Sequence, residues 1–453
     1  MRAPYLDDGD VRLYLGDCIE VMAEMDAESV DAVVTEPPYG LEFMGKGWDS
    51  FGADTRQRDD ATFTSGNRRH GLVRHGIGGS YGGDTGGAMR AFEQWCETWA
   101  LEAYRVLKPG GHLLAFGGTR TYHRLTCGIE DAGFEVRDCL SWLYGSGFPK
   151  SLDVSKAIDK AAGQQGEVVR QYETAIGGVT MNGGRGQWRG TITHRAPATD
   201  AAREWQGWGT ALKPGWEPCV VARKPLAGTV AANVQAHGTG ALNGDGCRID
   251  YANDADRPTQ EEWNRMGSSG AAGANGFAGQ FSKGMKDAYA EGKIPVPQGR
   301  WPANVVLDEQ AAAMLDAQSG ESRSTQSMRG ELHGSIYGGG NGPSGPSTIR
   351  GHDDTGGASR FFYTAKASRS DRSTNGANNT HPTVKPTDLM RWLVRLVTPP
   401  GGVVLDPFAG SGSTLVAARA EGVRCIGIER EDEYARIIAA RLSQLSLLSE
   451  DAS

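Results

Sequence analysis

A glycine-rich turn near the end of the chain has the features of a nucleoside site. An apolar run ends at Asp406, and the turn Pro-Phe-Ala-Gly410-Ser-Gly follows, where glycines allow a ligand to approach the backbone closely. Glu429 lies 19 positions after Gly410, about the spacing at which a carboxylate meets ribose hydroxyls. The turn holds no lysine or arginine, and Leu415 stands where a dinucleotide fingerprint has its third glycine. These features favour a nucleoside without phosphates, although a plain tight connection has the same pattern.

A second chemical motif follows an apolar run near the start of the chain. Residues 30–34 have the composition of a buried strand, and this strand ends in the stretch Thr35-Glu36-Pro37-Pro38-Tyr39-Gly40. Two consecutive prolines can continue neither a central strand nor the interior of a helix, so the chain must turn there. Because ligands of open α/β sheets bind at the carboxyl ends of strands, this turn is a second candidate site.

Alternating strand and helix patterns place both motifs in one α/β sheet. In the first half-domain we expect strands at 11–15, 30–34, 112–116 and 134–144, and helices at 18–25, 89–107 and 122–131. Toward the end of the chain we expect helices at 387–397, 413–420 and 431–442, and strands at 402–405 and 423–428. Ser413 or Thr414 is the expected cap of the second of these helices. Such alternation is typical of a doubly wound sheet.

Composition excludes several other classes of protein. The 65 glycines among 453 residues cluster in loops, which does not fit a fibrous repeat. The net charge of −8 argues against a uniformly basic surface, but it allows a local basic groove. The seven cysteines have no metal-like spacing, so we expect no metal site. With no signal peptide and no apolar run near 18 residues, we expect a reduced, cytoplasmic protein without a membrane partner.

Three stretches combine cations with aromatic residues or glycines, as nucleic-acid contacts do. They are a polar segment at 45–87, an unpatterned segment at about 145–300 and a basic, aromatic segment at 360–372. A solvated, disordered loop explains the segment 45–87 about as well, and a solvated charged face explains the segment 360–372. The segment 145–300 has the pattern of a separate, loop-rich domain. The residues that we expect to contact phosphates are Arg68, Arg69, Arg185, Arg189, Lys366 and Arg369.

Together, the two motifs resemble those of the amino-methylating DNA methyltransferases. That family has Asp, Asn or Ser before Pro-Pro-Tyr or Pro-Pro-Phe, and a cofactor turn that reads Asp-Pro-Phe-x-Gly-Ser-Gly. Catalytic motif first and cofactor motif last is the permuted order of the β group, and the stretch 381–386 is similar to that group's tenth motif. The resemblance implies a Rossmann-like, seven-stranded, mostly parallel sheet. This sheet would be circularly permuted and would carry a loop-rich inserted target-recognition domain.

The resemblance also implies a cofactor, S-adenosylmethionine, and roles for the residues of the turn. Glu429 would hold the ribose hydroxyls, Asp406 would lie beside the methionine end and Asp17 would face the adenine amino group. Thr383 or Lys385 would face the methionine carboxylate. The other cofactor-binding positions would be Pro407, Phe408, Gly410, Ser411 and Gly412.

The catalytic motif would then act on an amino group of a base. Glu36 and the carbonyl of Pro37 or Pro38 would accept its two N–H bonds, which favours a tetrahedral nitrogen aimed at the methyl group. Tyr39 would stack on a base that has been flipped out of the duplex. Because the methyl group is already activated on a sulfonium, this chemistry requires no metal.

We therefore expect a site-specific methyltransferase that acts on adenine N6 in double-stranded DNA, located with the nucleoid. The acidic Glu36 resembles the adenine enzymes, whereas the cytosine-N4 enzymes typically carry serine there. Cytosine N4 is the first alternative. A catalytically weak DNA-binding relative is the second, because Glu36 is one methylene longer than the family's aspartate. Membership of a restriction–modification system and a homodimeric assembly remain open.

The two motifs also suggest how the chain is divided. We expect residues 1–150 to form the catalytic half of the methyltransferase domain and residues 381–453 to form its cofactor-binding half. Residues 151–300 would form the target-recognition region, and residues 301–380 would be a connecting segment.

Overall fold

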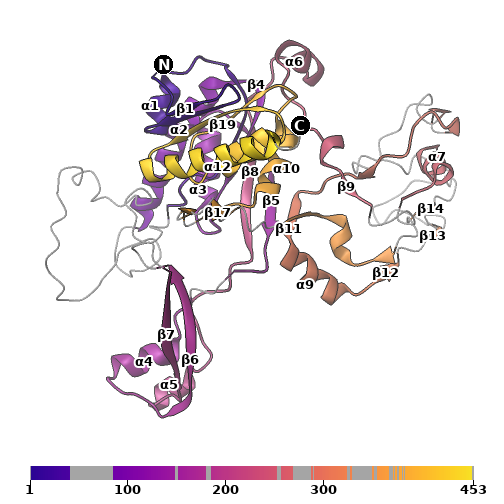
Figure 1. Cartoon of the computed structure of the whole chain (residues 1–453). Coiled ribbons are helices and arrows are strands. Elements are labelled where there is room, and N and C mark those ends of the chain that lie inside the picture. The colour runs from indigo at the N-terminus through magenta and orange to yellow at the C-terminus, as the bar shows by residue number, and fades with distance from the viewer. Residues whose placement is uncertain are drawn as a thin grey trace. The chain divides into compact units, whose positions relative to one another are not determined.

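The computed structural model divides into two compact units. It describes residues 2–40, 85–147, 151–179, 185–251, 257–268, 290–323, 355–366 and 383–450, with short pieces at 287–288, 327–328, 349–350, 371, 373–374, 377–379 and 381. The larger unit comprises Met1–Leu143, Glu217–Asn375 and Asn379–Ser453. The smaller unit comprises Tyr144–Trp216 and Gly376–Asn378. Figure 1 shows the helices and strands of both units.

The larger unit is built on a mostly parallel sheet. Among the described residues this sheet has ten strands, in the order β1-β2-β20-β19-β3-β4-β8-β5-β11-β16. Neighbouring strands from β2 to β4 in this order are parallel, as are β5, β11 and β16, whereas β1 and β8 run antiparallel to β2 and β4. The strand bounds are β1 (Leu6–Asp7), β2 (Val11–Leu15), β3 (Val30–Thr35), β4 (Leu107–Phe116), β5 (Glu135–Leu143), β8 (Trp216–Arg223), β11 (Val305–Asp308), β16 (Tyr363–Ala365), β19 (Val403–Asp406) and β20 (Arg424–Glu429).

The prediction of an α/β fold with a large, mostly parallel sheet is confirmed. The sheet has more strands than the expected seven. One of them, β8, shows that the segment expected to lack regular structure contributes a strand to the main sheet. Strand β8 lies between β4 and β5, inside the segment in which the sequence shows no regular pattern. The permuted order of the motifs and the inserted recognition domain stay predictions.

Strands from the two ends of the chain interleave in the middle of this sheet. Strands β20 and β19 lie between β2 and β3, with Leu15 opposite Glu429 and Val33 opposite Leu405. Because these four strands are parallel, their carboxyl ends lie at one edge of the sheet. Both sequence motifs follow strands of this group.

Helices cover both faces of the sheet. Side chains of β3 alternate between two cores, as the two-residue period of a strand requires: Val33 packs with α1, α2 and α3, whereas Ala32 and Val34 pack with α10, α11 and α12. The helix α12, drawn in yellow in Figure 1, contacts the strands β2 and β20. These helices are α1 (Cys18–Ala23), α2 (Thr85–Val106), α3 (Tyr122–Asp131), α10 (Thr387–Val397), α11 (Ser413–Ala420) and α12 (Asp432–Glu450). In the described part of the chain, no helix is long and apolar enough to cross a bilayer.

Shorter elements complete the larger unit. The helices are α6 (Val230–His237), α7 (Gln260–Ser268) and α9 (Glu309–Ser319), with 3-10 turns η4 (Asp245–Cys247) and η6 (Ala358–Phe361). The short strands are β9 (Ile249–Asp250), β10 (Gly299–Arg300), β12 (Ser322–Arg323), β13 (Ser327–Met328), β14 (Ile349–Arg350), β15 (Thr355–Gly356) and β17 (Ser373–Thr374).

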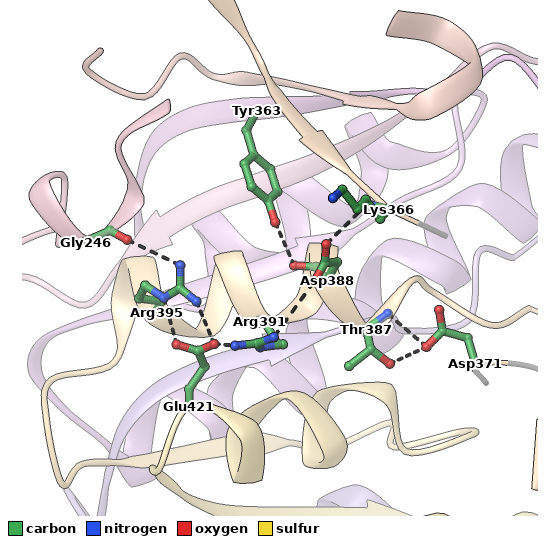
Figure 2. A network of polar contacts seen from close by, with 9 residues as sticks. All are labelled: Gly246, Tyr363, Lys366, Asp371, Thr387, Asp388, Arg391, Arg395 and Glu421. Atoms are coloured by element: carbon green, nitrogen blue, oxygen red, sulfur yellow. Dashed lines mark hydrogen bonds and ion pairs between the residues drawn. The ribbon is translucent and has the colours of Figure 1, made fainter. Parts of the chain in front are cut away.

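Polar contacts fix both ends of α10, the helix that follows the stretch 381–386. Near its end, the Arg391 and Arg395 side chains donate to the carboxylate of Glu421 at 2.7 Å (Figure 2). At its start, the Thr387 amide donates to Asp371 Oδ1 at 3.3 Å, and the Thr387 hydroxyl bonds to the same oxygen. These contacts hold the backbone directly after Lys385 in place.

The smaller unit is a long hairpin with two short helices. Strands β6 (Val168–Val179) and β7 (Arg185–Arg195) pair antiparallel, and α4 (Val154–Ala161) and α5 (Asp200–Glu204) flank them in sequence. The Asp159 carboxylate accepts hydrogen bonds from the Ala198 amide at 2.8 Å and the Thr199 amide at 3.0 Å, which ties the two helical segments together. The chain enters this unit after β5 and leaves it into β8, which are neighbours in the main sheet. Strand β18 (Ala377–Asn378) also belongs to this unit.

Candidate functional site

Four acidic residues lie at the carboxyl ends of four neighbouring parallel strands. Glu429 ends β20 and Asp406 ends β19, while Glu36 directly follows β3 and Asp17 follows β2 by two positions. Since the sheet order is β2-β20-β19-β3, the four residues form a row along one edge. This is the edge at which open α/β sheets bind their ligands.

A buried hydrogen bond joins the two sequence motifs. The Thr35 hydroxyl donates to Asp406 Oδ1 at 2.6 Å, and the Phe408 amide donates to the same oxygen at 3.1 Å. Burial raises the pKa of Asp406, and the hydrogen bonds from Thr35, Thr414 and Phe408 oppose that rise. The carboxylate is therefore held in one orientation between the catalytic motif and the glycine turn.

Backbone amides of the turn and of the following loop hold the Glu429 side chain. The Gly410 amide donates to Glu429 Oε2 at 2.7 Å, and the Glu431 amide donates to Oε1 at 2.9 Å. Gly410 has φ +54°, and a Cβ there would lie 3.0 Å from His381 Nε2, so a side chain would be strained and crowded. Burial raises the pKa of Glu429 to about 7 in spite of these amides.

The predicted cap of α11 is wrong. Gly412, with φ +80°, is the N-cap residue, and among the described residues no side-chain cap bonds to the first amides of the helix. The Ser413 hydroxyl donates instead to the carbonyl of Lys385 at 3.0 Å, and Thr414 bonds to Asp406. The two hydroxyls thus connect the turn to the rest of the site.

Asp17 serves as the cap of a helix. Its Oδ1 accepts from the Ile19 amide at 2.9 Å at the start of α1. This local role accounts for an aspartate after β2 without any ligand. A contact with an adenine amino group stays a prediction.

Lys385 lies between two carboxylates. Its Nζ makes ion pairs with Glu36 Oε1 and, at 2.8 Å, with Glu217 Oε2. The Tyr39 hydroxyl lies 3.1 Å from the same Glu36 oxygen and 3.2 Å from the same Glu217 oxygen. The ammonium is 5% exposed and lies 4.8 Å from the ring centroid of Phe116. We call these four residues — Glu36, Tyr39, Glu217 and Lys385 — the carboxylate–lysine cluster.

Burial and charge shift the titration of this cluster. Burial raises the pKa of Glu36, Lys385 lowers it and Glu217 raises it further. Burial alone would lower the pKa of Lys385, but the two carboxylates together raise it above its ordinary value. Burial and the same carboxylates raise the pKa of Tyr39 well above 10.0, so its phenol is neutral and donates one hydrogen bond. Two carboxylates facing one ammonium leave the cluster with one negative charge.

Two prolines and a hydrogen bond constrain the turn that follows β3. Pro37 is buried, and the Thr121 hydroxyl donates to the carbonyl of Tyr39 at 2.6 Å. A proline has no amide hydrogen, so neither Pro37 nor Pro38 competes as a donor for the carboxylate. The arrangement can therefore present a carboxylate oxygen and a carbonyl oxygen to a planar amino group.

Sequence analysis missed Glu217 and the role of Thr35. Glu217 is the second residue of β8, and this strand runs antiparallel to β4, so its start lies at the carboxyl edge of the parallel strands. The apolar run at 219–222 is a signal for a strand, but no feature of the sequence gives the direction of that strand. The resemblance implies that Thr383 or Lys385 faces a methionine carboxylate, and in the structure Lys385 forms ion pairs with Glu36 and Glu217. The methionine-carboxylate role of Thr383 or Lys385 remains a prediction, and the Thr383 amide bonds to His381 Nδ1 at 3.3 Å.

The expected phosphate contacts are only partly described. Lys366 is exposed, and its amide donates to Asp388 Oδ2 at 3.4 Å (Figure 2). Arg185 and Arg189 lie on β7. Arg68, Arg69 and Arg369 lie outside the described residues. All six stay predictions.

Comparison with known proteins identifies a matching family. A family model described as DNA methylase matches residues 30–175 and 241–440. The type II methyltransferase M.HindIII of Haemophilus influenzae is 26% identical over 236 residues, which cover 51% of this chain and 64% of that protein. The putative methylase YubD of Escherichia coli K12 is 50% identical over 66 residues, 15% of this chain and 29% of that protein. The chain thus spans less than two thirds of the length of either relative.

Similar solved structures are DNA methyltransferases. The PvuII DNA methyltransferase, which is cytosine-N4-specific, has a TM-score of 0.42 and 13% identity, over 97% of this chain and 89% of that one. A putative DNA modification methylase of Thermus thermophilus complexed with S-adenosyl-L-methionine has a TM-score of 0.35 and 16% identity, over 95% of this chain and 94% of that one.

Proposed function

Because this chain belongs to the DNA methylase family, we propose that it transfers a methyl group from S-adenosylmethionine to an exocyclic amino nitrogen of a base in double-stranded DNA. The base that we propose is adenine, methylated at N6. The hydrogen bond from Thr35 to Asp406 supports this proposal most directly, because it places the catalytic motif beside the candidate cofactor turn.

The residues around the glycine turn fit this cofactor. The buried Glu429 carboxylate can accept hydrogen bonds from ribose hydroxyls, and Asp406 offers a negative charge near a cationic group. The turn carries no cation that would favour a phosphate. When bound, S-adenosylmethionine supplies a methyl group that is already activated on a sulfonium.

Glu36 is the proposed acceptor for the amino group. The nitrogen of an exocyclic amino group is a poor nucleophile because its lone pair is delocalised into the ring. Hydrogen bonds from its two N–H groups, to Glu36 and to the carbonyl of Pro37 or Pro38, favour a tetrahedral nitrogen with a localised lone pair. Tyr39 is then the proposed stacking partner of the flipped base, and its hydroxyl is already directed toward Glu36.

Adenine is favoured over cytosine by the acid before Pro-Pro-Tyr. The adenine-N6 members of the family carry an acidic residue or asparagine there, and the cytosine-N4 members typically carry serine. Glu36 keeps the charge and the acceptors of an aspartate. Cytosine N4 remains the alternative that the experiment below distinguishes.

The smaller unit is the proposed site of target recognition. Arg170 lies 5.1 Å from the ring centroid of Tyr172, and that ring stacks on His194 at 5.9 Å, so a cation and two rings share one stretch of the hairpin. Trp208, which is 61% exposed, offers another aromatic surface. Such groups suit phosphate contacts and base stacking.

Long-read sequencing of DNA from a host that expresses the protein tests this function. We expect N6-methyladenine at one sequence motif, absent when the host expresses Glu36→Ala. Cytosine-N4 methylation at a motif would replace the adenine assignment. No methylation by the wild type in the host, together with no transfer of radiolabel to DNA by purified protein, would refute the proposal.

A further inference from the structure

Glu217 and Glu36 share one ammonium group. Lys385 Nζ contacts Glu36 through Oε1 and Glu217 through Oε2, and the Tyr39 hydroxyl lies against the same two oxygens. No residue in the described ranges donates to the other oxygen of Glu36, Oε2. One oxygen of the Glu36 carboxylate is therefore held by the cluster, and the other has no hydrogen-bond donor among the described residues.

The proposed reaction changes the charge of this cluster. As the amino nitrogen forms a bond to the methyl carbon, the carbon–sulfur bond breaks and its electron pair stays on the neutral sulfide. The nitrogen must then lose one proton, and we assign Glu36 Oε2, the oxygen without a donor in the described residues, as its acceptor. Glu36 becomes a neutral acid until the proton passes to water after product release.

Protonation of Glu36 would remove one of the two partners of Lys385. The ammonium is 5% exposed, and a buried charge without a partner is strongly unfavourable. Glu217 keeps its contact at 2.8 Å through this step, so the ammonium retains a counter-ion.

We propose that Glu217 is a positioning residue for methyl transfer, which holds Lys385 as a constant counter-ion and so allows Glu36 to take up the proton of the reacting amino group. The inference rests on the proposed function. It assigns Lys385 to the catalytic motif. Glu217 itself touches neither the base nor the methyl group.

The first test needs no DNA. We compare the thermal unfolding midpoints of wild type, Glu36→Gln, Glu217→Gln and the double variant, because either single variant leaves Lys385 one carboxylate and the double variant leaves none. We expect the double variant to lose more than the sum of the singles, and Lys385→Met in that background to restore the midpoint. Additive losses would overturn the counter-ion role.

The second test measures single-turnover methyl transfer from pH 6 to 9. We expect Glu217→Gln to slow transfer by about 10–100-fold with the affinities for cofactor and DNA unchanged, and Glu217→Asp to recover part of the rate. Removing the negative neighbour also lowers the pKa of Glu36, so the acidic limb of the pH profile moves to lower pH. A merely structural defect would lower the rate at every pH without moving that limb.

Glu135 provides a matched control. Its carboxylate forms an ion pair with Arg223, at the other end of β8, at 2.6 Å. We expect Glu135→Gln to keep the wild-type rate and profile. Equal rates for wild type and Glu217→Gln in an active enzyme would overturn the positioning role alone. If the wild type transfers no methyl group to any DNA, both the proposed function and the role of Glu217 in methyl transfer are refuted. The unfolding test then still decides whether Glu217 is a counter-ion of Lys385.

Discussion

The Thr35 hydroxyl donates to Asp406 Oδ1 at 2.6 Å, across 371 positions of the chain. Both residues are buried, with Thr35 at the end of β3 and Asp406 at the end of β19. This contact fixes the distance between the turn that carries Glu36 and the turn that carries Gly410. A displacement of one turn is therefore expected to displace the other.

Removing this hydroxyl should destabilise the protein. Thr35→Val keeps the shape of the side chain but leaves a buried carboxylate with one donor fewer, so we expect the free energy of unfolding to fall by about 1–3 kcal/mol. Denaturant unfolding measures the change. Thr98→Val is the control, because the Thr98 hydroxyl bonds within an exposed turn of α2 and its loss should change little. Equal stability of Thr35→Val and wild type would contradict the role of this hydrogen bond.

Cofactor affinity should rise with pH through the titration of Glu429. Its pKa of about 7 in the folded protein lies above its ordinary value of 4.5, and only the carboxylate can accept from both ribose hydroxyls. We expect calorimetry to show tighter binding of S-adenosylmethionine at pH 8 than at pH 6, with proton release near pH 7. Glu429→Ala should weaken binding roughly 10-fold or more at pH 8.

The raised pKa of Glu429 should also make the stability of the cofactor-free protein fall with rising pH, whereas cofactor affinity rises with pH. Because the folded pKa is raised, Glu429 contributes stability that is fully present below pH 4.5 and is lost as the pH rises through about 7. Glu429→Gln should remove this dependence and the pH dependence of binding. The exposed Glu433→Gln should keep both. A Glu429→Gln protein with unchanged affinity at pH 8 would refute the ribose assignment.

The length of Glu36 should matter for the rate. The side chain reaches Lys385, and shortening it by one methylene withdraws the carboxylate by about an ångström, which can cost on the order of 100-fold in a step that depends on geometry. We expect slower single-turnover methylation by Glu36→Asp and still slower transfer by Glu36→Ala. A faster rate with Glu36→Asp would mean that the longer glutamate side chain slows methyl transfer. A Glu36→Ala enzyme as fast as wild type would exclude Glu36 from catalysis.

Sequence preference should follow the smaller unit. We expect an exchange of residues 144–216 with those of a relative to transfer the methylated motif while cofactor affinity stays constant. An exchange of 217–300 should leave the motif unchanged, because β8 belongs to the main sheet. If the motif follows 217–300, recognition lies in the larger unit. The methylated positions in host DNA provide the measurement.

DNA affinity should depend steeply on salt despite the net charge of −8. Local contacts between cations and phosphates set that slope, and the total charge does not. Titration of labelled duplex between about 50 and 200 mM salt measures it, with Lys366→Ala reducing the slope by about one if Lys366 contacts a phosphate. An unchanged slope would remove Lys366 from the interface.

Local patterns predicted most of the central sheet. Strand β2 and helix α10 have the predicted bounds because their apolar spacing alone determines their buried faces. Strand β8 is different, since its burial depends on pairing with β4 and β5. The carboxylate–lysine cluster likewise depends on the direction of β8, which brings Glu217 to Lys385. The spacing of residues along the chain predicts neither the pairing of β8 with β4 and β5 nor the direction of β8.

The interleaving of the two chain ends also governs the order in which the protein can fold. Val33 pairs with Leu405, 372 positions later, and β2 pairs with β20, so neither β2 nor β3 meets this neighbour until β19 and β20 have left the ribosome. Pairings of this range are slow to form, and unpaired apolar strand edges invite aggregation in the meantime. The two inner edges of the future sheet, on β2 and β3, therefore stay open until β19 and β20 have been synthesised and insert between them.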